Sequence, residues 1–543
     1  MSHPLSIAFV WHMHQPYYRN RRTGECRLPW VRLHGTKDYL DMVQLLGDFP
    51  TVHQTFNLVP SLLEQLNDYL PPANRSDRFL DLSRKPADEL TDEDKRFLLE
   101  QFFMANWDHM IKPHARYHDL LAKRGNPLDE HGWTEAVRRF KSQEYLDLQV
   151  WFNLVWIDPW LRQQDEPLRR LEGKGRQFTE DDKRLVLDAQ LALLSRVVSA
   201  YRDAQQRGQV ELTTSPYYHP IVPLVCDLRS AQMALPHLPI PEHGFRHPDD
   251  ARWHLTQALE RHARTFGRRP QGLWPPEGSV SEDLVLLAIE QGMRWIATDE
   301  EILWRTLKTS RSPSLLYRPH LLHRTQGRAA IIFRDRELSD LIGFVYSQWP
   351  AQHAVQDFLR RLEGIAQQLR GERLPALVSI ILDGENAWEF YHRDGHDFLR
   401  GLYEALAGDE RFRVVTVSEF LDRFPLDQTP SLPDLFAGSW IDGNFATWIG
   451  HPEKNAAWNH LAKAREDLAA SAQASEEAWR HFYIAEGSDW MWWYGDTHSS
   501  AQDEEFDALF RTHLINLYQA LGQEPPAALH LPIKTRLIRP ACE

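Results

Sequence analysis

The alternation of short apolar runs with longer helical patterns is the feature that most limits the folds open to this chain. Strands are predicted at 6–11, 51–56, 209–214, 272–274, 294–298, 341–346, 377–382 and 413–417. Amphipathic patterns typical of helices lie between several of them, for example at 281–291 and 354–370. Such alternation predicts an α/β fold with a parallel sheet, either open or closed into a barrel.

The composition and the predicted secondary structure of the sequence change after about residue 425. Residues 426–450 are loop-like and rich in Pro, Gly, Asp and Trp. Helices are predicted beyond them, at 455–474, 476–485 and 503–521. We therefore expect a catalytic barrel domain with helical insertions over 1–425 and a mostly helical C-terminal region over 426–543.

Composition excludes several classes of partner and of site. The formal charge of the 543 residues is 62 − 76 = −14. An acidic chain is poorly suited to bind nucleic acid or an anionic membrane, because both carry negative charge. Its longest apolar runs are too short to span a membrane, and no signal peptide is evident. The three cysteines, Cys26, Cys226 and Cys542, are too few for a disulfide framework, so a cytoplasmic location is expected.

Two acidic side chains follow apolar strands and stand beside tryptophans. Asp383 comes directly after the predicted strand 377–382, and Glu277 follows Trp274 after two prolines. A lone acid at a strand end is most often a helix cap or an exposed turn. Two of them, at the positions where barrel enzymes place catalytic groups, favour a carboxylate pair that cleaves glycosides.

His12 and His14 point to the same side of an extended strand because they are two residues apart. With Asp383 they form a candidate metal site of a deacetylase or a metal-dependent mannosidase. The other roles open to them are hydrogen bonding to sugar hydroxyls and a purely structural role at a strand end.

The segment 486–496 is unusually rich in aromatic and acidic residues. It holds three Trp, one Tyr and two Asp within eleven residues, which favours a binding surface over ordinary core. Trp440 and Trp448 lie in the preceding loop, where core packing and sugar contact are equally good interpretations.

Five motifs in register resemble glycoside hydrolase family 57, a group of enzymes active on α-glucans. The motifs are His12-Met13-His14-Gln15-Pro16, Gly208-Gln209-Val210-Glu211-Leu212, Leu273-Trp274-Pro275-Pro276-Glu277, Leu382-Asp383-Gly384-Glu385 and Ala485-Glu486-Gly487-Ser488-Asp489. Together with the Trp cluster that follows the last motif, they extend over nearly the whole chain.

The resemblance implies an incomplete (β/α)7 parallel barrel followed by a helical region, and a retaining double displacement without a cofactor or catalytic metal. Glu277 matches the family nucleophile and Asp383 the general acid/base, which implies carboxyl groups about 5 to 5.5 Å apart. The same matching assigns substrate-binding roles to His12, His14, Trp30, His34, Glu211, Trp274, Trp388, Asp489 and Trp492.

The implied activity is hydrolysis of α-1,4 glucosidic bonds in an α-glucan or maltooligosaccharide, of α-amylase or amylopullulanase type, with α-1,6 bonds as a further candidate. Transfer to a second sugar, by a 4-α-glucanotransferase or a branching enzyme, would use the same carboxylates. Leu382 stands where His is common in the family, which leaves the specificity open. A catalytically silent glucan-binding protein and the metal-dependent deacetylase are the remaining alternatives.

Overall fold

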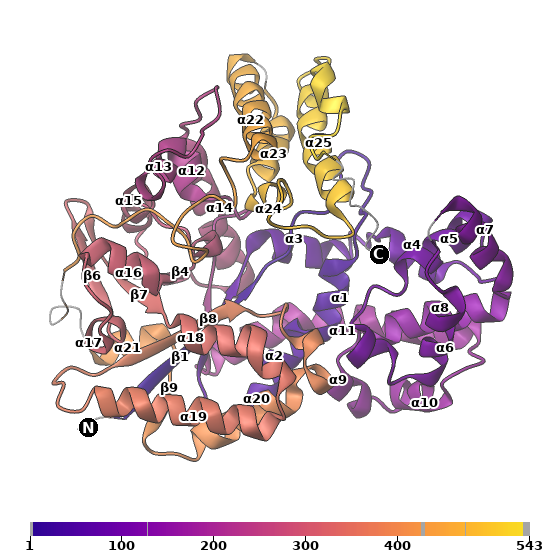
Figure 1. The fold of residues 1–543 in the computed structure, drawn as a ribbon, viewed down its shortest axis with the longest axis horizontal. Helices are drawn as coiled ribbons and strands as arrows, with labels where there is room; N and C mark the ends of the chain where they lie inside the picture. Colours follow the sequence, from indigo (N-terminus) through magenta and orange to yellow (C-terminus); the bar gives the residue numbers. More distant parts are fainter. Residues whose placement is uncertain (1–3, 128, 425–428, 430, 473, 536–543) are drawn as a thin grey trace.

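The computed structural model describes residues 4–127, 129–424, 429, 431–472 and 474–535. Its centre is a sheet in which seven parallel strands follow the order β3-β2-β1-β8-β7-β5-β4, while β6 pairs antiparallel with β7 and β9 pairs with the start of β1 (Figure 1). The strands are β1 (Leu5–Met13), β2 (Gln54–Leu58), β3 (Val210–Thr213), β4 (Gly272–Leu273), β5 (Trp295–Asp299), β6 (His320–Arg324), β7 (Gly327–Arg334), β8 (Leu377–Asp383) and β9 (Phe412–Val414).

The two ends of the sheet meet and nearly close it into a barrel. Thr214, just after β3, forms a parallel bridge with Leu273 of β4, and the Trp274 amide donates to the Thr214 carbonyl at 3.3 Å. The predicted incomplete seven-stranded (β/α) barrel is therefore confirmed. Parallel strands in such a barrel direct their carboxyl ends to one mouth, where side chains from distant motifs can meet.

Apolar side chains fill the inside of the barrel. Val10 of β1, Trp295 of β5 and Ile381 of β8 belong to one buried cluster that also contains Val417 and Phe420. These last two residues lie on α21 (Val417–Arg423), so this helix packs against the barrel interior at the end opposite the mouth. The barrel interior is therefore a packed core, and the carboxyl ends of the strands are the end at which a site can form.

Helices and short helical turns follow most of the barrel strands, and most of the longer helices other than α21 cover the outside of the sheet. The helices and turns are α1 (Trp30–Lys37), α2 (Tyr39–Leu45), η1 (Leu46–Asp48), α3 (Pro60–Asp68), α12 (Val222–Cys226), η3 (Leu228–Ser230), α13 (Ala231–Ala234), α14 (Pro248–Phe266), η4 (Pro276–Gly278), α15 (Glu282–Glu290), α16 (Glu300–Leu307), α17 (Pro313–Leu316), α18 (Arg336–Asp340), η5 (Leu341–Val345), η6 (Tyr346–Gln348), α19 (Ala351–Gln368), η7 (Trp388–Phe390), η8 (His392–Gly395), α20 (His396–Ala407) and α21.

A large helical insertion between β2 and β3 forms the right-hand lobe of Figure 1. Its helices are α4 (Arg78–Arg84), α5 (Asp92–Gln101), η2 (Trp107–Ile111), α6 (Ala115–Arg124), α7 (Glu130–Arg139), α8 (Ser142–Val155), α9 (Pro159–Gln164), α10 (Glu166–Lys174) and α11 (Glu180–Gln206). Thr91 and Thr179 begin α5 and α11 with capping boxes, in which the threonine hydroxyl and an Asp three residues later satisfy exposed amides.

The C-terminal helices are α22 (Pro452–Ala470), α23 (Glu476–Ala485), α24 (Ser488–Trp492), α25 (Asp503–Ala520) and η10 (Ala527–His530). They pack on the barrel helix α14. Arg465 pairs with Asp250 at 2.7 Å, and Tyr483 stacks on Trp253 with ring centroids 3.7 Å apart. The predicted domain boundary near residue 425 lies outside the described residues. No helix among the described residues is long and apolar enough to cross a membrane.

One predicted strand is wrong, and one hairpin escaped prediction. The apolar run 341–346 forms η5, a π-helical turn, and η6. The strand that follows β5 in the barrel is instead β7, which turns back from β6 through the residues between Arg324 and Gly327. Short apolar runs of this length fit a buried strand or a buried helical turn equally well, and only the tertiary pairing of the neighbouring strands decides.

Candidate active site

Glu277 lies at the mouth of the barrel, on the turn that follows β4. It occupies the left-handed backbone region at φ +58°, which is unfavourable for a residue with a side chain. The turn is held in place by neighbours: the Trp440 amide donates to the Glu277 carbonyl at 3.1 Å. Trp440 also donates its indole Nε1–H to Oε2 of Glu277 at 2.9 Å, so one side chain orients the carboxylate.

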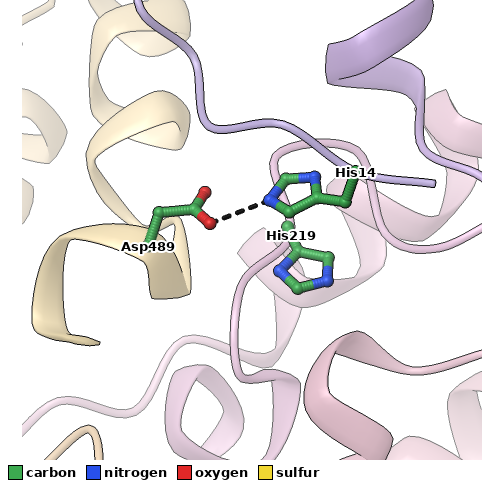
Figure 2. Close-up of side chains that lie close together, drawn as sticks. All are labelled: His14, His219 and Asp489. Atoms are coloured by element: carbon green, nitrogen blue, oxygen red, sulfur yellow. Dashed lines mark hydrogen bonds and ion pairs between the residues drawn. The ribbon is translucent and has the colours of Figure 1, made fainter. Parts of the chain in front are cut away.

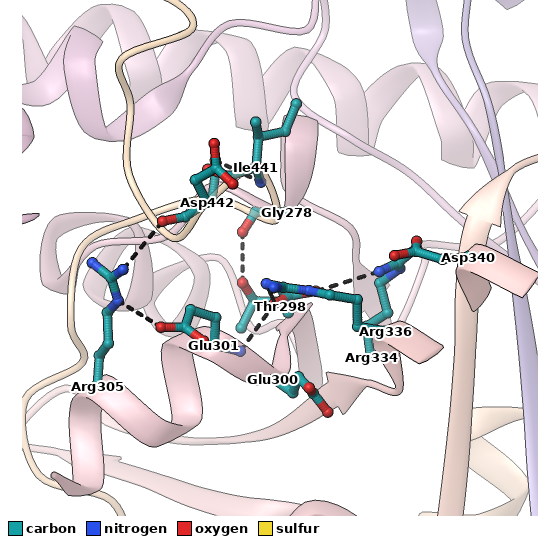
Figure 3. A network of polar contacts seen from close by, with 12 residues as sticks. Gly278, Thr298, Glu300, Glu301, Arg305, Arg334, Arg336, Asp340, Ile441 and Asp442 are labelled. Carbon is teal, nitrogen blue, oxygen red and sulfur yellow. Dashed lines mark hydrogen bonds and ion pairs between the residues drawn. The ribbon is translucent and has the colours of Figure 1, made fainter. Parts of the chain in front are cut away.

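A polar network beneath this turn fixes it to β5 and β7 (Figure 3). Thr298 of β5 donates its hydroxyl to the Gly278 carbonyl at 2.6 Å. Asp299, the last residue of β5, accepts hydrogen bonds from both Arg334 and Arg336. Arg305 joins Glu301 to the Asp442 carbonyl, which anchors the loop that carries Trp440. The strained turn is therefore over-determined by its surroundings, as a positioned catalytic group requires.

Asp383 is the last residue of β8, and in the register of the sheet it lies beside His12 of β1. Asn386 donates to its Oδ2 at 2.8 Å. Arg334, at the end of β7, donates to the Ile381 carbonyl at 2.6 Å and stacks over the Trp440 ring at 5.3 Å. Arg334 thus lies between the residue that orients Glu277 and the strand that carries Asp383.

The two carboxyl groups interact electrostatically. Burial, followed by the negative charge of Asp383, raises the pKa of Glu277 to about 8. Burial also raises the pKa of Asp383, while Asn386, His14 and Arg334 oppose this rise. A pair of this kind retains one proton into the neutral range, and its titration belongs to the pair.

A third carboxylate, Glu385, lies behind the pair. Its Oε1 accepts from the His14 amide at 3.4 Å and from Gln15 Nε2 at 3.3 Å, while its buried Oε2 has no protein partner among the described residues. Burial and the charge of Asp383 raise the pKa of Glu385 well above its ordinary value. The mouth therefore concentrates acidic groups and disfavours their full ionisation.

His12 belongs to a chain of hydrogen bonds that crosses the mouth. Asn57 donates its Nδ2 to Thr213, so its Oδ1 is left to accept from His12 Nδ1 at 2.7 Å. His12 Nε2 then accepts from His219 Nε2 at 3.0 Å, and His219 Nδ1 accepts from the Ser488 hydroxyl at 2.9 Å. Burial lowers the pKa of His12 to about 3 and that of His219 well below 6.5, so both rings are neutral.

His14 and Asp489 form the outer part of this cluster (Figure 2). The Nε2 of His14 lies 2.8 Å from Oδ1 of Asp489, which α24 brings over the barrel mouth. The His14 ring stacks on His219 with centroids 3.8 Å apart, and His14 Nδ1 is buried without a partner in the described part of the chain. The C-terminal region therefore contributes directly to the candidate site.

The cluster does not fit a shared metal ion. The ligand-type atoms of His14, His219 and Asp489 lie within 4.8 Å of one another. Both nitrogens of His219 are engaged, however, and the two nearly parallel rings direct their lone pairs side by side instead of toward one point. The alternative metal site of His12, His14 and Asp383 is not among the ligand clusters of the described residues.

Two residues predicted to bind substrate lie elsewhere. Glu211 sits inside the barrel, where it accepts from Trp295 Nε1 at 2.9 Å and from the amide and hydroxyl of Ser418. Trp388 is 1% exposed, packs against Trp11 and donates to the Gly384 carbonyl at 2.7 Å. Glu211 therefore fastens the closed end of the barrel, and Trp388 supports the Asp383 loop, so we leave both out of the sugar site.

The remaining predicted aromatic residues divide between core and site. Trp274 is fully buried against Trp440, and its Nε1 lacks a partner among the residues that the structure describes. Trp30 is half-buried and packs on His34, whose Nδ1 lies 2.6 Å from Asp38. Trp30 and His34 both belong to α1, and Trp30 donates its Nε1–H to Gln502 at 3.0 Å.

The Trp-rich segment 486–496 divides between the core and the surface. Trp490 and Tyr494 are buried, whereas Trp492 is half-buried and packs against Trp448 and His498. Trp448 itself is fully buried, so of the two tryptophans in the preceding loop it is Trp440 that reaches Glu277.

Sequence reasoning missed His219 and Arg334. Both follow the rule that found Asp383, because His219 comes soon after β3 and Arg334 ends β7. Arg334 was missed because β7 itself was not predicted. His219 lies in the left-handed region at φ +59°, and that backbone conformation directs its ring toward His12.

A (β/α) barrel whose mouth carries two interacting carboxyl groups, flanked by histidines and tryptophans, defines a carbohydrate-active enzyme of the two-carboxylate class. Residues 8–433 match the model of glycosyl hydrolase family 57, and the chain belongs to that family. None of the curated protein sequences matches it.

Solved structures of the family share the fold at low sequence identity. The α-amylase AmyC from Thermotoga maritima is 13% identical, with TM-score 0.59 over 96% of this chain and 94% of that one. A branching enzyme from Pyrococcus horikoshii is 17% identical, with TM-score 0.59 over 98% and 99%. A 4-α-glucanotransferase from Thermococcus litoralis is 14% identical, with TM-score 0.53 over 95% of this chain and 60% of that one.

Proposed function

We propose that this chain is a retaining, α-glucan-active glycoside hydrolase that cleaves α-1,4 glucosidic bonds by double displacement. The observation that carries the proposal is the carboxylate pair of Glu277 and Asp383. Glu277 follows β4, Asp383 is the last residue of β8, and the two groups interact electrostatically at the mouth of the barrel. Family membership and the fold shared with an α-amylase support it.

In the first step Glu277 attacks the anomeric carbon and Asp383 protonates the leaving oxygen, which gives a covalent glycosyl-enzyme. In the second step Asp383 accepts a proton from water, which displaces Glu277. The two steps need one proton shared by the pair, and this proton is on Asp383 when Glu277 attacks. Burial raises the pKa of both groups, which favours retention of that proton. Carboxyl groups about 5 to 5.5 Å apart would suit this mechanism.

The sugar beside the cleaved bond would be held by neutral and acidic hydrogen-bonding groups. The side chains of His14 and Asp489 are 10% and 13% exposed, and Glu385 behind the pair has a buried oxygen without a partner in the described part of the chain. Trp492 and Trp30 would supply flat apolar surfaces on either side, with His34 beside Trp30. His12, with both ring nitrogens engaged, would act by orienting its neighbours.

The product pattern on maltoheptaose tests the proposal. We expect shorter oligosaccharides only, with reducing ends rising in step with cleavage. Glu277→Gln should lower turnover by at least about 10³-fold while preserving the fold. Wild-type turnover retained by this variant would contradict the assignment of the nucleophile.

Transfer is the second candidate function, because a branching enzyme and a 4-α-glucanotransferase share this fold. It would use the same carboxylates, with a sugar hydroxyl in place of water in the second step. Products longer than maltoheptaose, at nearly constant reducing ends, would favour it over hydrolysis. Pullulan would then test whether α-1,6 bonds are cleaved, as an amylopullulanase requires, and starch whether polymers are substrates. A cytoplasmic location, supported by the low cysteine count, completes the proposal.

A further inference from the structure

The exposed apolar side chains of this protein are concentrated at one place. Among the described residues, the large exposed ones are Trp107, Met233, Phe344, Val345, Trp349, Phe390 and Leu531. Five of these seven lie on η2, on η5 to the residue after η6, or on η7. Single exposed apolar residues are ordinary on a protein surface, whereas a group on neighbouring segments indicates a binding surface.

These segments are packed together although they are far apart in sequence. Tyr391, the neighbour of Phe390, donates its hydroxyl to the carbonyl of Ile342, two residues before Phe344, at 2.5 Å. η6 also packs on η7, and η7 packs on η2, which carries Trp107. We call Trp107, Phe344, Trp349 and Phe390 the aromatic rim.

Two segments of the aromatic rim follow the barrel strands whose ends carry Asp383 and Arg334. Phe390 follows Asp383 by seven residues, and the loop between them is held by the Asn386–Asp383 hydrogen bond. On the other side, Arg334 binds Asp340 at 2.5 Å, and Phe344 follows four residues later. The segment with Phe390 therefore follows the end of β8, which carries Asp383, and the segment with Phe344 follows the end of β7, which carries Arg334.

The chemistry of the rim suits a sugar chain. Its rings are 41% to 78% exposed, with Phe344 the most exposed, and they are separated by exposed polar residues that include Asp108, Gln348, Asn386 and Arg393. A pyranose presents an apolar face to a ring and hydroxyls to polar groups at its edge. A protein partner would instead favour a continuous apolar centre with polar residues outside it.

We propose that the aromatic rim binds glucose units remote from the cleaved bond, so that the enzyme's preferred substrate is a long α-glucan chain. This inference rests on the proposed function, because it assigns a substrate length to the same site. Rings that stack on distant units add affinity without entering the chemical step, so their contribution grows with chain length until the rim is filled.

The test compares a long amylose chain with maltotriose. The triple variant Trp107→Ala, Phe344→Ala, Phe390→Ala should lower kcat/KM for amylose by about tenfold, mainly through KM, and change kcat/KM for maltotriose by less than about twofold. Leu531→Ala, an exposed apolar residue outside the rim, is the matched control and should change neither. The conservative substitutions Phe344→Tyr and Phe390→Tyr should keep most of the binding, because a ring is retained.

Binding of amylose to the Glu277→Gln protein, with and without the rim substitutions, measures affinity apart from turnover. An equal effect on both substrates, or none on either, would overturn the rim as a chain-binding surface. So would a wild-type dimer that the substitutions convert to a monomer, since the rim would then be an interface between copies. Failure of the proposed function would be distinguishable from failure of the rim proposal, because the wild-type protein itself would then turn over no α-glucan.

Discussion

At the scale of single residues, the site depends on the cost of burying carboxylates near one another. Glu277 has a pKa of about 8 because burial and the charge of Asp383 both oppose its ionisation. Glu385 is buried beside them, with one oxygen that has no partner among the described residues. The ionised form of each group would be more stable in water. Burial of these carboxylates at the mouth therefore lowers the folding stability of the protein.

Glu277→Gln should therefore stabilise the fold as it removes turnover. The folded pKa lies above the ordinary value of 4.5, so the folded state keeps a proton that the unfolded state has lost, and wild-type stability falls as pH rises from about 4.5 to about 8. Gln does not titrate, so the variant does not lose this stability as the pH rises. The difference between 4.5 and about 8 corresponds to a gain of up to about 5 kcal/mol above pH 8, with little gain below pH 4.5. Denaturant unfolding across pH is the measurement.

Glu260→Gln, on the exposed side of α14, is the control for this measurement and should follow the wild-type pH dependence. A stability difference between Glu277→Gln and wild type that is independent of pH would show that Glu277 does not titrate as described.

At the scale of elements, the loop that carries Trp440 does more than connect the barrel to the C-terminal helices. Its bridge between Gly438 and Val280, and the hydrogen bonds from Trp440 to both the backbone and the side chain of Glu277, fix the strained turn after β4. The indole donor favours the ionised carboxylate and so opposes the rise in the pKa of Glu277.

Trp440→Phe keeps a ring at this position and removes the donor. The pKa of Glu277 should rise further, so the alkaline limb of kcat/KM, where the pair loses its shared proton, should move from about pH 8 to higher pH. The value of kcat/KM below that limb should fall about tenfold, since a hydrogen bond to a charged group is lost. The measurement is a pH profile of kcat/KM on maltoheptaose.

Trp448→Phe is the matched control, because Trp448 is a buried indole of the same loop whose Nε1 has no partner among the described residues. It should lower stability without moving the limb. An unmoved limb in Trp440→Phe would mean that the indole does not tune the carboxylate.

At the scale of the whole molecule, the C-terminal helices complete the site and share the core. Asp489 and Ser488 of α24 reach His14 and His219, and the bridge between Pro220 and Gly487 joins the two chain segments. One continuous apolar cluster includes residues of the barrel, of the helical insertion and of α22 to α25. Two sequence regions therefore behave as one packing unit.

We expect a single unfolding transition for the full chain, since neither region can lose its packing alone. Differential scanning calorimetry is the measurement, with the calorimetric and van't Hoff enthalpies equal within error. Asp250→Asn, which leaves Arg465 half-paired between α14 and α22, should lower the temperature of this one transition. Two resolved transitions would mean that the regions fold independently.

The sequence by itself determined the strand–helix order, the C-terminal helices and the residue types at the strand ends, because periodicity and local polarity are properties of short segments. Those local patterns singled out Glu277, Asp383, His12 and His14 as candidates. Tertiary structure alone decided which polar residues converge. It placed Glu211 at the closed end of the barrel, Trp388 in the core and Trp440 on Glu277. Burial and partners depend on contacts between segments hundreds of residues apart, which no local pattern specifies.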